Sequence, residues 1–202
     1  MSNRSGWFPL RANNKRKGFE LNMRSTASKL LLNDHDKVGD LLGQLLAALH
    51  DKDVQSSYAK LDLLWARLAV HIRAEHLHLF PAVLNALSSD AAAEWNDVRS
   101  QIERLREDHN FFMRELARAV SILRELPLDS PDIETRLTSV LEVVLEVEKR
   151  LANHNEMEEN YIYRWATKFL TKPEQMDLAR RINAELEHRP SRFSVNAWAN
   201  DR

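Results

Sequence analysis

The chain has 202 residues, which is enough to bury a sizeable core in one large domain without disulfides. It contains no cysteine, and this excludes disulfides, thiol nucleophiles, zinc fingers and iron–sulfur ligation. A formal net charge of −1 gives no reason to expect nucleic acid or an anionic membrane surface as a partner, and the scarcity of glycine and proline favours an all-α protein.

Residues 1–24 form a polar, basic segment in which Trp7 and Phe8 are the main apolar residues. We expect a solvated N-terminal arm, because no aromatic residues alternate with the basic ones as they do in single-strand-binding surfaces. The segment lacks the apolar core of a signal peptide, and no apolar run in the chain approaches the roughly 18–20 residues of a membrane span. Cytoplasm is therefore the expected compartment.

Four long patterns of apolar residues at helical spacing follow the arm, at about residues 25–50, 56–87, 91–125 and 131–170. Ser88 to Asp90 offers an N-cap for the third helix, and Ser130 with Pro131 predicts the N-cap and first position of the fourth. Pro81 predicts a kink in the second helix, since proline removes a backbone donor and collides with the preceding turn.

Short connections between long helices make consecutive helices antiparallel neighbours. The sequence therefore predicts an up-down-up-down four-helix bundle over residues 25–170, with a short C-terminal helix and tail over residues 171–202. No segment shows the sustained alternation of a β-strand.

Each predicted helix carries one histidine in place of an apolar residue on its inner stripe: His35, His71, His109 and His154. Two of these histidines are followed four residues later by a glutamate, Glu75 or Glu158, and positions i and i+4 are neighbours on one face of a helix. The first and third helices also share a short motif, Asp-His-Asp at residues 34–36 and Asp-His-Asn at residues 108–110. The two halves of the chain therefore repeat each other weakly and predict one central site.

Burying two carboxylates and four imidazoles without a metal would be costly unless they paired with one another. Six such ligands are too many for one tetrahedral zinc ion, and they suit two ions bridged by Glu75 and Glu158. Iron fits this ligand set best, and manganese and zinc are not excluded by it.

The remaining histidines, His50, His76, His78 and His188, fall off the inner stripe or near a terminus, and we expect them at the surface. Glu75 and His78 form a Glu-x-x-His pair, the spacing of ferritin-like di-iron bundles. The only other such pair, Glu185 and His188, lies too close to the C-terminus to face the first. A ferritin-like site is therefore disfavoured.

Four motifs occur in order along the chain: a histidine, an HxxxE followed by Leu-Phe-Pro, another histidine, and a second HxxxE. On these motifs the sequence resembles the hemerythrin-like (HHE cation-binding) domains over about residues 25–170. This resemblance implies a non-heme di-iron site with an oxo or hydroxo bridge. His35, His71, His109 and His154 would be its nitrogen ligands, and Glu75 and Glu158 its carboxylate bridges.

The sequence departs from the oxygen-carrying hemerythrins at two positions. Met113 stands where those proteins have a second histidine in the third helix, and Glu158 comes four residues after His154, where they have an aspartate at five. Four histidines and two glutamates are more similar to the iron–sulfur repair (RIC-type) proteins and related bacterial members. The cysteine-containing N-terminal domain usual in the repair proteins is not found in this sequence.

Two functions remain open from the sequence. The first is a di-iron protein that binds or reacts with O2, NO or peroxide, or that stores or donates iron under oxidative or nitrosative stress. The second is a sensory or interaction bundle with a structural metal, whose arm or tail binds a protein partner or a second copy of the chain. The ligand set does not distinguish an enzyme from a storage, transport or sensory protein.

Overall fold

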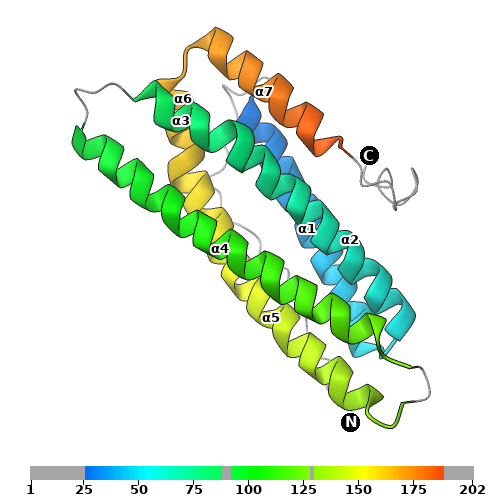
Figure 1. Ribbon diagram of the computed structural model, residues 1–202. Coiled ribbons are helices and arrows are strands. Elements are labelled where there is room, and N and C mark those ends of the chain that lie inside the picture. The colour runs from blue at the N-terminus through cyan, green and yellow to red at the C-terminus, as the bar shows by residue number, and fades with distance from the viewer. Residues whose placement is uncertain (1–25, 88–91, 128–129, 189–202) are drawn as a thin grey trace, which may run out of the picture.

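The computed structural model describes residues 26–87, 92–127 and 130–188, and all of the regular structure in these ranges is helical. Four antiparallel helical segments run side by side, which confirms the predicted all-α, up-down-up-down bundle (Figure 1). Helices α1 (Ala27–His50) and α2 (Val54–Ala74) form one hairpin, and α4 (Ala92–Arg124) and α5 (Ile133–Met157) form the other. The predicted arm with Trp7 and Phe8, the predicted N-cap at residues 88–90 and the end of the tail after residue 188 lie outside the described residues.

The second and fourth helical segments are interrupted by one π-helical turn each. Turn η3 (Glu75–Leu79) joins α2 to α3 (Phe80–Ala86), and turn η4 (Glu158–Ile162) joins α5 to α6 (Tyr163–Phe169). In both turns a backbone N–H donates to the carbonyl five residues earlier, from Phe80 to Glu75 and from Tyr163 to Glu158. Pro81 follows the first turn, where the helix has already lost its regular hydrogen-bond ladder.

The second and fourth helical segments begin at other residues than the sequence predicted, because local capping and turn contacts fix their first residues. The α2 helix begins at Val54, because the Asp53 side chain accepts the N–H of Ser56 at 2.9 Å. The prediction that Ser130 caps the fourth helix is wrong. Ser130 and the two residues after it form a turn instead, and the helix begins at Ile133 with Asp132 at the N-cap.

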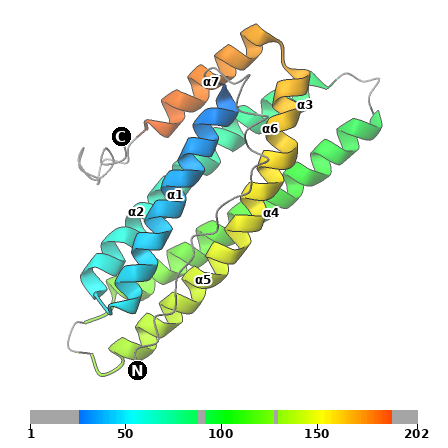
Figure 2. The same cartoon turned by 180° about the vertical axis from the view of Figure 1, so that it is seen from behind.

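A final helix, α7 (Lys172–Leu186), folds back against α1 and α2 (Figures 1 and 2). Thr171 and Glu174 form a capping box at its start, and Pro173 is tolerated there because the first turn of a helix has no partner for its N–H. None of the helices in the described ranges is long and apolar enough to span a membrane.

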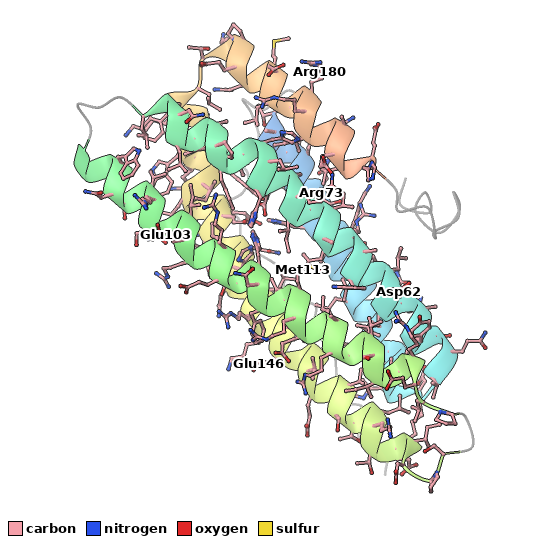
Figure 3. All side chains as sticks on the ribbon, viewed as in Figure 1. Asp62, Arg73, Glu103, Met113, Glu146 and Arg180 are labelled. Atoms are coloured by element: carbon pink, nitrogen blue, oxygen red, sulfur yellow. The ribbon has the colours of Figure 1, made fainter. Side chains whose placement is uncertain are left out.

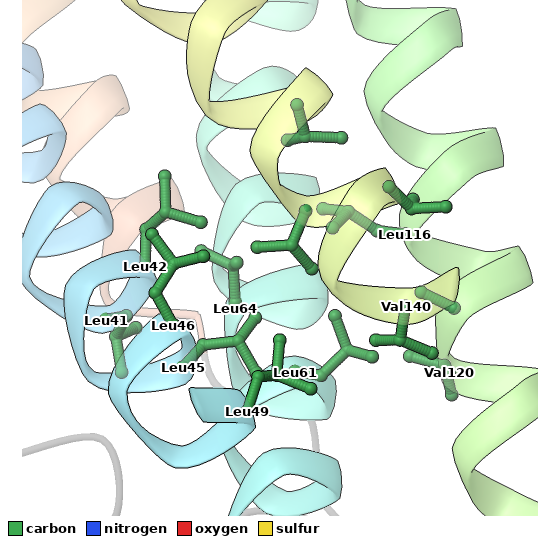
Figure 4. Packing of buried hydrophobic residues seen from close by; sticks show 14 of the residues in the cluster. Leu41, Leu42, Leu45, Leu46, Leu49, Leu61, Leu64, Leu116, Val120 and Val140 are labelled. Atoms are coloured by element: carbon green, nitrogen blue, oxygen red, sulfur yellow. The ribbon is translucent and has the colours of Figure 1, made fainter. Parts of the chain in front are cut away.

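The described part of the interior contains two large apolar clusters, and a small third one where Ala66 and Val70 of α2 meet Leu186 of α7. The loop-end cluster lies near the α1–α2 and α4–α5 connections and includes Leu45, Leu61, Leu116 and Val140 (Figure 4). The α7-end cluster includes Leu31, Leu79, Ile102 and Ile162, together with Leu178 and Ile182 of α7. Each of the four helical segments of the bundle contributes residues to both of these large clusters, and the four inner-stripe histidines lie between them.

Candidate metal centre

The six residues predicted as metal ligands meet in the middle of the bundle, and all of them are buried. We call them the His/Glu cluster: His35, His71, Glu75, His109, His154 and Glu158. They form two groups of four, and within each group one ligand atom per residue lies within 4.8 Å of the others. We call the group with His35 and His71, from the first hairpin, the first metal position, and the group with His109 and His154, from the second hairpin, the second, because each could hold an ion. Both positions share Glu75 and Glu158.

The two carboxylates link the hairpins, because the two oxygens of each face histidines from different hairpins. Glu75 places Oε1 at 3.3 Å from Nε2 of His71 and Oε2 at 3.3 Å from Nε2 of His109. Glu158 places Oε1 at 3.2 Å from Nε2 of His154 and Oε2 at 3.2 Å from Nε2 of His35. Each glutamate therefore has the arrangement that a carboxylate bridge between two ions requires.

The polar atoms inside the cluster are not satisfied by the protein alone. Both carboxylate oxygens of Glu75, Oε1 of Glu158 and Nε2 of His71 are buried without a hydrogen-bond partner among the described residues. Nε2 of His109 lies 3.0 Å from Nε2 of His154, so two ring nitrogens face each other at close range. Buried polar atoms are nearly always paired in native proteins, and cations would satisfy these lone pairs together. The residues therefore fit a metal centre.

Two of the histidines are oriented by carboxylates on their outer side. Nδ1 of His71 lies 3.0 Å from Asp34, which also accepts a hydrogen bond from Arg67 at 2.6 Å. This contact leaves Nε2 of His71 facing the cluster. Such outer partners fix the tautomer and ring orientation of a metal-binding imidazole.

The second hairpin repeats this arrangement. Nδ1 of His154 lies 3.3 Å from Asp108, which accepts a hydrogen bond from Arg150 at 2.6 Å. The sequence indicated the aspartates through the repeated Asp-His motif, but it gave no sign of their arginine partners.

The other two histidines have outer partners of different chemistry. Oε1 of Glu159 lies 3.6 Å from Nδ1 of His35, and Nε2 of His76 lies 2.8 Å from Nδ1 of His109. The prediction that His76 lies at the surface is therefore wrong, since its ring is half-buried against a cluster histidine. Burial and the neighbouring His109 lower the pKa of His76 to about 4, so the ring is neutral at pH 7.

Tyr163 is a neighbour of the cluster that the sequence did not reveal. It is fully buried, and its hydroxyl lies 3.2 Å from Nε2 of His35 and donates to Oε2 of Glu158 at 3.4 Å. On the opposite side of the cluster Phe80 stacks on His109, with ring centroids 6.0 Å apart. The only available signal was that Tyr163 and Phe80 each follow a cluster glutamate by five residues.

The remaining predicted positions lie away from the cluster. Met113 lies on α4 (Figure 3), partly buried against the loop-end cluster, so it supplies packing where an oxygen carrier would add a histidine. His78 was expected at the surface, but its side chain is only 20% exposed and lies 3.9 Å from Glu185 of α7, so that prediction is wrong. His50 and His188 are exposed, as predicted.

The charged groups of the cluster offset one another in part when no metal is bound. Burial alone would lower the pKa of His71, but Glu75 and Asp34 raise it well above the usual range. Burial alone would raise the pKa of Glu158, but His154 and His35 lower it well below the usual range. The metal-free cluster therefore holds charged imidazoles beside charged carboxylates, and a metal ion must displace the imidazole protons.

The stability of the metal-free protein is expected to depend on pH through His154. Burial alone would lower its pKa, but Glu158 and Asp108 raise it from 6.5 to about 9 in the fold. The protonated ring then stabilises the fold fully below about pH 6.5, and this stabilisation is lost as the pH rises towards 9. We expect the melting temperature of the metal-free protein to fall over this range, as measured by circular dichroism. The metal-loaded protein is the control, and a rising melting temperature of the metal-free protein would contradict the assignment.

The fold and the cluster together define a class of protein, an antiparallel four-helix bundle with internal histidines and glutamates that could hold metal ions. A family model described as the hemerythrin HHE cation binding domain matches residues 26–166. The chain therefore belongs to the hemerythrin HHE cation-binding family, as its motif set indicated. Helix α7 lies beyond the matched residues. No curated protein and no solved structure matches the chain.

Proposed function

We propose that the protein is a non-heme di-iron protein that binds or reacts with O2, NO or peroxide, or that handles iron under oxidative or nitrosative stress. The observation that carries this proposal is the sharing of two carboxylates by two groups of histidines. A single ion would leave half of the imidazoles without a partner, whereas two adjacent ions use all six side chains.

The ligand types favour iron over the other metals. Imidazole and carboxylate together suit non-heme iron, which commonly keeps open positions beside its protein ligands. Each metal position offers two imidazoles and two carboxylate oxygens, so a small molecule can complete the coordination of the ion. A pair of iron ions would supply one-electron redox chemistry and binding of small ligands, while the protein fixes the ligands and excludes water.

The surroundings of the first metal position support a small ligand. A small cavity of about 10 Å³, the least space that can hold one water molecule, lies beside His35, His71 and His154. Its other walls are mainly apolar and include Val38, Leu68 and Leu151. A space this small excludes an organic substrate beside the cluster, so any ligand that completes the coordination must be small.

The proposal is tested by iron analysis together with the absorption spectrum of aerobically purified protein. We expect about two irons per chain in the wild type, since two groups of histidines share the two glutamates. We expect a loss of at least one iron on His71→Ala, since Nε2 of this residue points into the cluster. His50→Ala, which changes an exposed histidine on α1, is the control and is expected to retain both irons. A wild-type protein that binds no iron, or a His71→Ala protein that keeps both, would refute the proposal.

A further inference from the structure

The His/Glu cluster is built from two halves that correspond residue by residue. Adding 74 to a residue number in α1 gives the corresponding residue in α4. Adding 83 to a residue number in α2 or η3 gives the corresponding residue in α5 or η4. By this rule Asp34 corresponds to Asp108 and Arg67 to Arg150. The structure gives both members of each pair the same contact, an arginine bound to an aspartate that faces Nδ1 of a cluster histidine.

The correspondence breaks at the residue after each cluster glutamate. Position 159 holds a glutamate, and its counterpart, position 76, holds a histidine. Both side chains lie beside Nδ1 of a cluster histidine on the neighbouring hairpin. His76 is within hydrogen-bond distance of His109 at 2.8 Å, whereas Glu159 lies 3.6 Å from His35, at an ion-pair distance that is too long for a hydrogen bond. The first metal position therefore has carboxylates behind both of its histidines, whereas the second has a carboxylate behind one and an imidazole behind the other.

This difference changes how strongly each position attracts a cation. A carboxylate behind an imidazole raises the basicity of the ring and adds negative charge near the ion, whereas an imidazole never carries negative charge at neutral pH. The surroundings reinforce the contrast, because the guanidinium of Arg106 lies 5.9 Å from the centre of the Phe80 ring, which stacks on His109. On the other side of the cluster the corresponding aromatic residue is Tyr163, whose hydroxyl contacts His35 and Glu158.

We propose that the two metal positions are inequivalent, and that Glu159 and His76 are the positioning residues that make them so. The first metal position fills first and holds its ion more tightly, and the second fills last and releases its ion first. Removal of such an outer partner typically changes metal affinity about tenfold to a hundredfold, which sets the size of the expected difference. The inference rests on the proposed function only in requiring that both positions bind metal.

The direct test adds ferrous iron anaerobically to the full-length metal-free protein. We expect calorimetry to resolve two binding steps with affinities at least about tenfold apart. Crystals grown with one equivalent of iron are expected to show the anomalous signal mainly between His35 and His71. Equal occupancy of the two positions, or preferential occupancy of the second, would overturn the inference while leaving the proposed function intact. Failure of the protein to bind iron would overturn both.

Exchange of the two outer partners tests the assignment to these residues. In the double variant His76→Glu with Glu159→His, the carboxylate and the imidazole change places, and we expect the order of filling to reverse. His76→Glu alone is expected to narrow the gap between the two affinities. Neither side chain is fully buried, so both variants are expected to fold, and their melting temperatures provide the check. An unchanged order of filling in a folded double variant would refute the role of these residues.

Discussion

Removal of the metal is expected to lower the melting temperature of the protein by roughly 8–16 °C. A ligand present at a thousand times its dissociation constant stabilises the native state by about 4 kcal/mol. For a chain of this length, each 1 kcal/mol shifts the melting temperature by about 2–4 °C. The measurement is a pair of thermal melts of the same preparation, one loaded with iron and one treated with a chelator under reducing conditions.

The physical reason for this large effect is the charge that the metal neutralises. Without cations the carboxylates of Glu75 and Glu158 lie in the apolar centre of the bundle, and Glu75 has no hydrogen-bond partner for either oxygen among the described residues. Protonated histidines compensate for part of this cost, as their raised pKa values indicate. A bound metal would also join the two hairpins, since each glutamate faces a histidine of the other hairpin.

Glu75→Gln is the matched variant for this experiment. It keeps the shape of the side chain but removes the charge and one of the two oxygens that face His71 and His109. We expect its melting temperature to respond much less to the chelator than that of the wild type. A wild-type melting temperature that does not change on chelation would favour a bundle in which the cluster pairs with itself and holds no metal.

The architecture and the membership of the His/Glu cluster were predictable because both follow from helical periodicity. His35, His71, His109 and His154 each occupy a position on an apolar stripe, and a stripe that faces the core must bring its residues together. The i, i+4 spacing then fixes Glu75 and Glu158 on the same face as their histidines. No knowledge of loop structure was needed, because the short connections leave only one simple arrangement of the four helices.

The π-helical turns were not predictable, and the misplacement of His76 follows from them. A π turn holds more residues than an α turn, so successive side chains are rotated less about the helix axis. His76 and Glu159 therefore remain near the face of the glutamate that precedes each of them. A regular helix would have turned both of them further from the cluster. The sequence contains a proline near the first turn only, so proline does not explain why both turns begin at a cluster glutamate.

The outer arginines were missed for a different reason. Arg67 and Arg150 each lie four residues before a cluster histidine, on the apolar side of the helix, where a long basic side chain is unexpected. Their position is explained by the aspartates of the neighbouring helices, which accept their hydrogen bonds at 2.6 Å. Each contact joins two helices of one hairpin, so periodicity within a single helix could not reveal it.

Asp34→Asn is expected to destabilise the fold by about 3–5 kcal/mol, whereas Asp108→Asn is expected to cost about 1 kcal/mol or less. Both aspartates accept a hydrogen bond from an arginine and face Nδ1 of a cluster histidine, so the two variants remove the same chemistry. Their surroundings differ. Asp34 and Arg67 have side-chain exposures of only 5% and 6%, while Asp108 and Arg150 have exposures of 15% and 38%.

The exposure decides the outcome because water can replace a lost partner only where it can reach the remaining charge. Asp34→Asn removes a buried carboxylate that accepts a hydrogen bond from Arg67 at 2.6 Å and faces Nδ1 of the buried His71 at 3.0 Å, and no water reaches this place to replace it. After Asp108→Asn the side chain of Arg150 can turn towards solvent. Urea unfolding of both metal-free variants at neutral pH measures the two losses in the absence of any effect on metal affinity. Equal losses of unfolding free energy in the two variants would contradict this prediction. They would show that the difference in exposure between the two aspartate–arginine pairs does not change their contribution to stability.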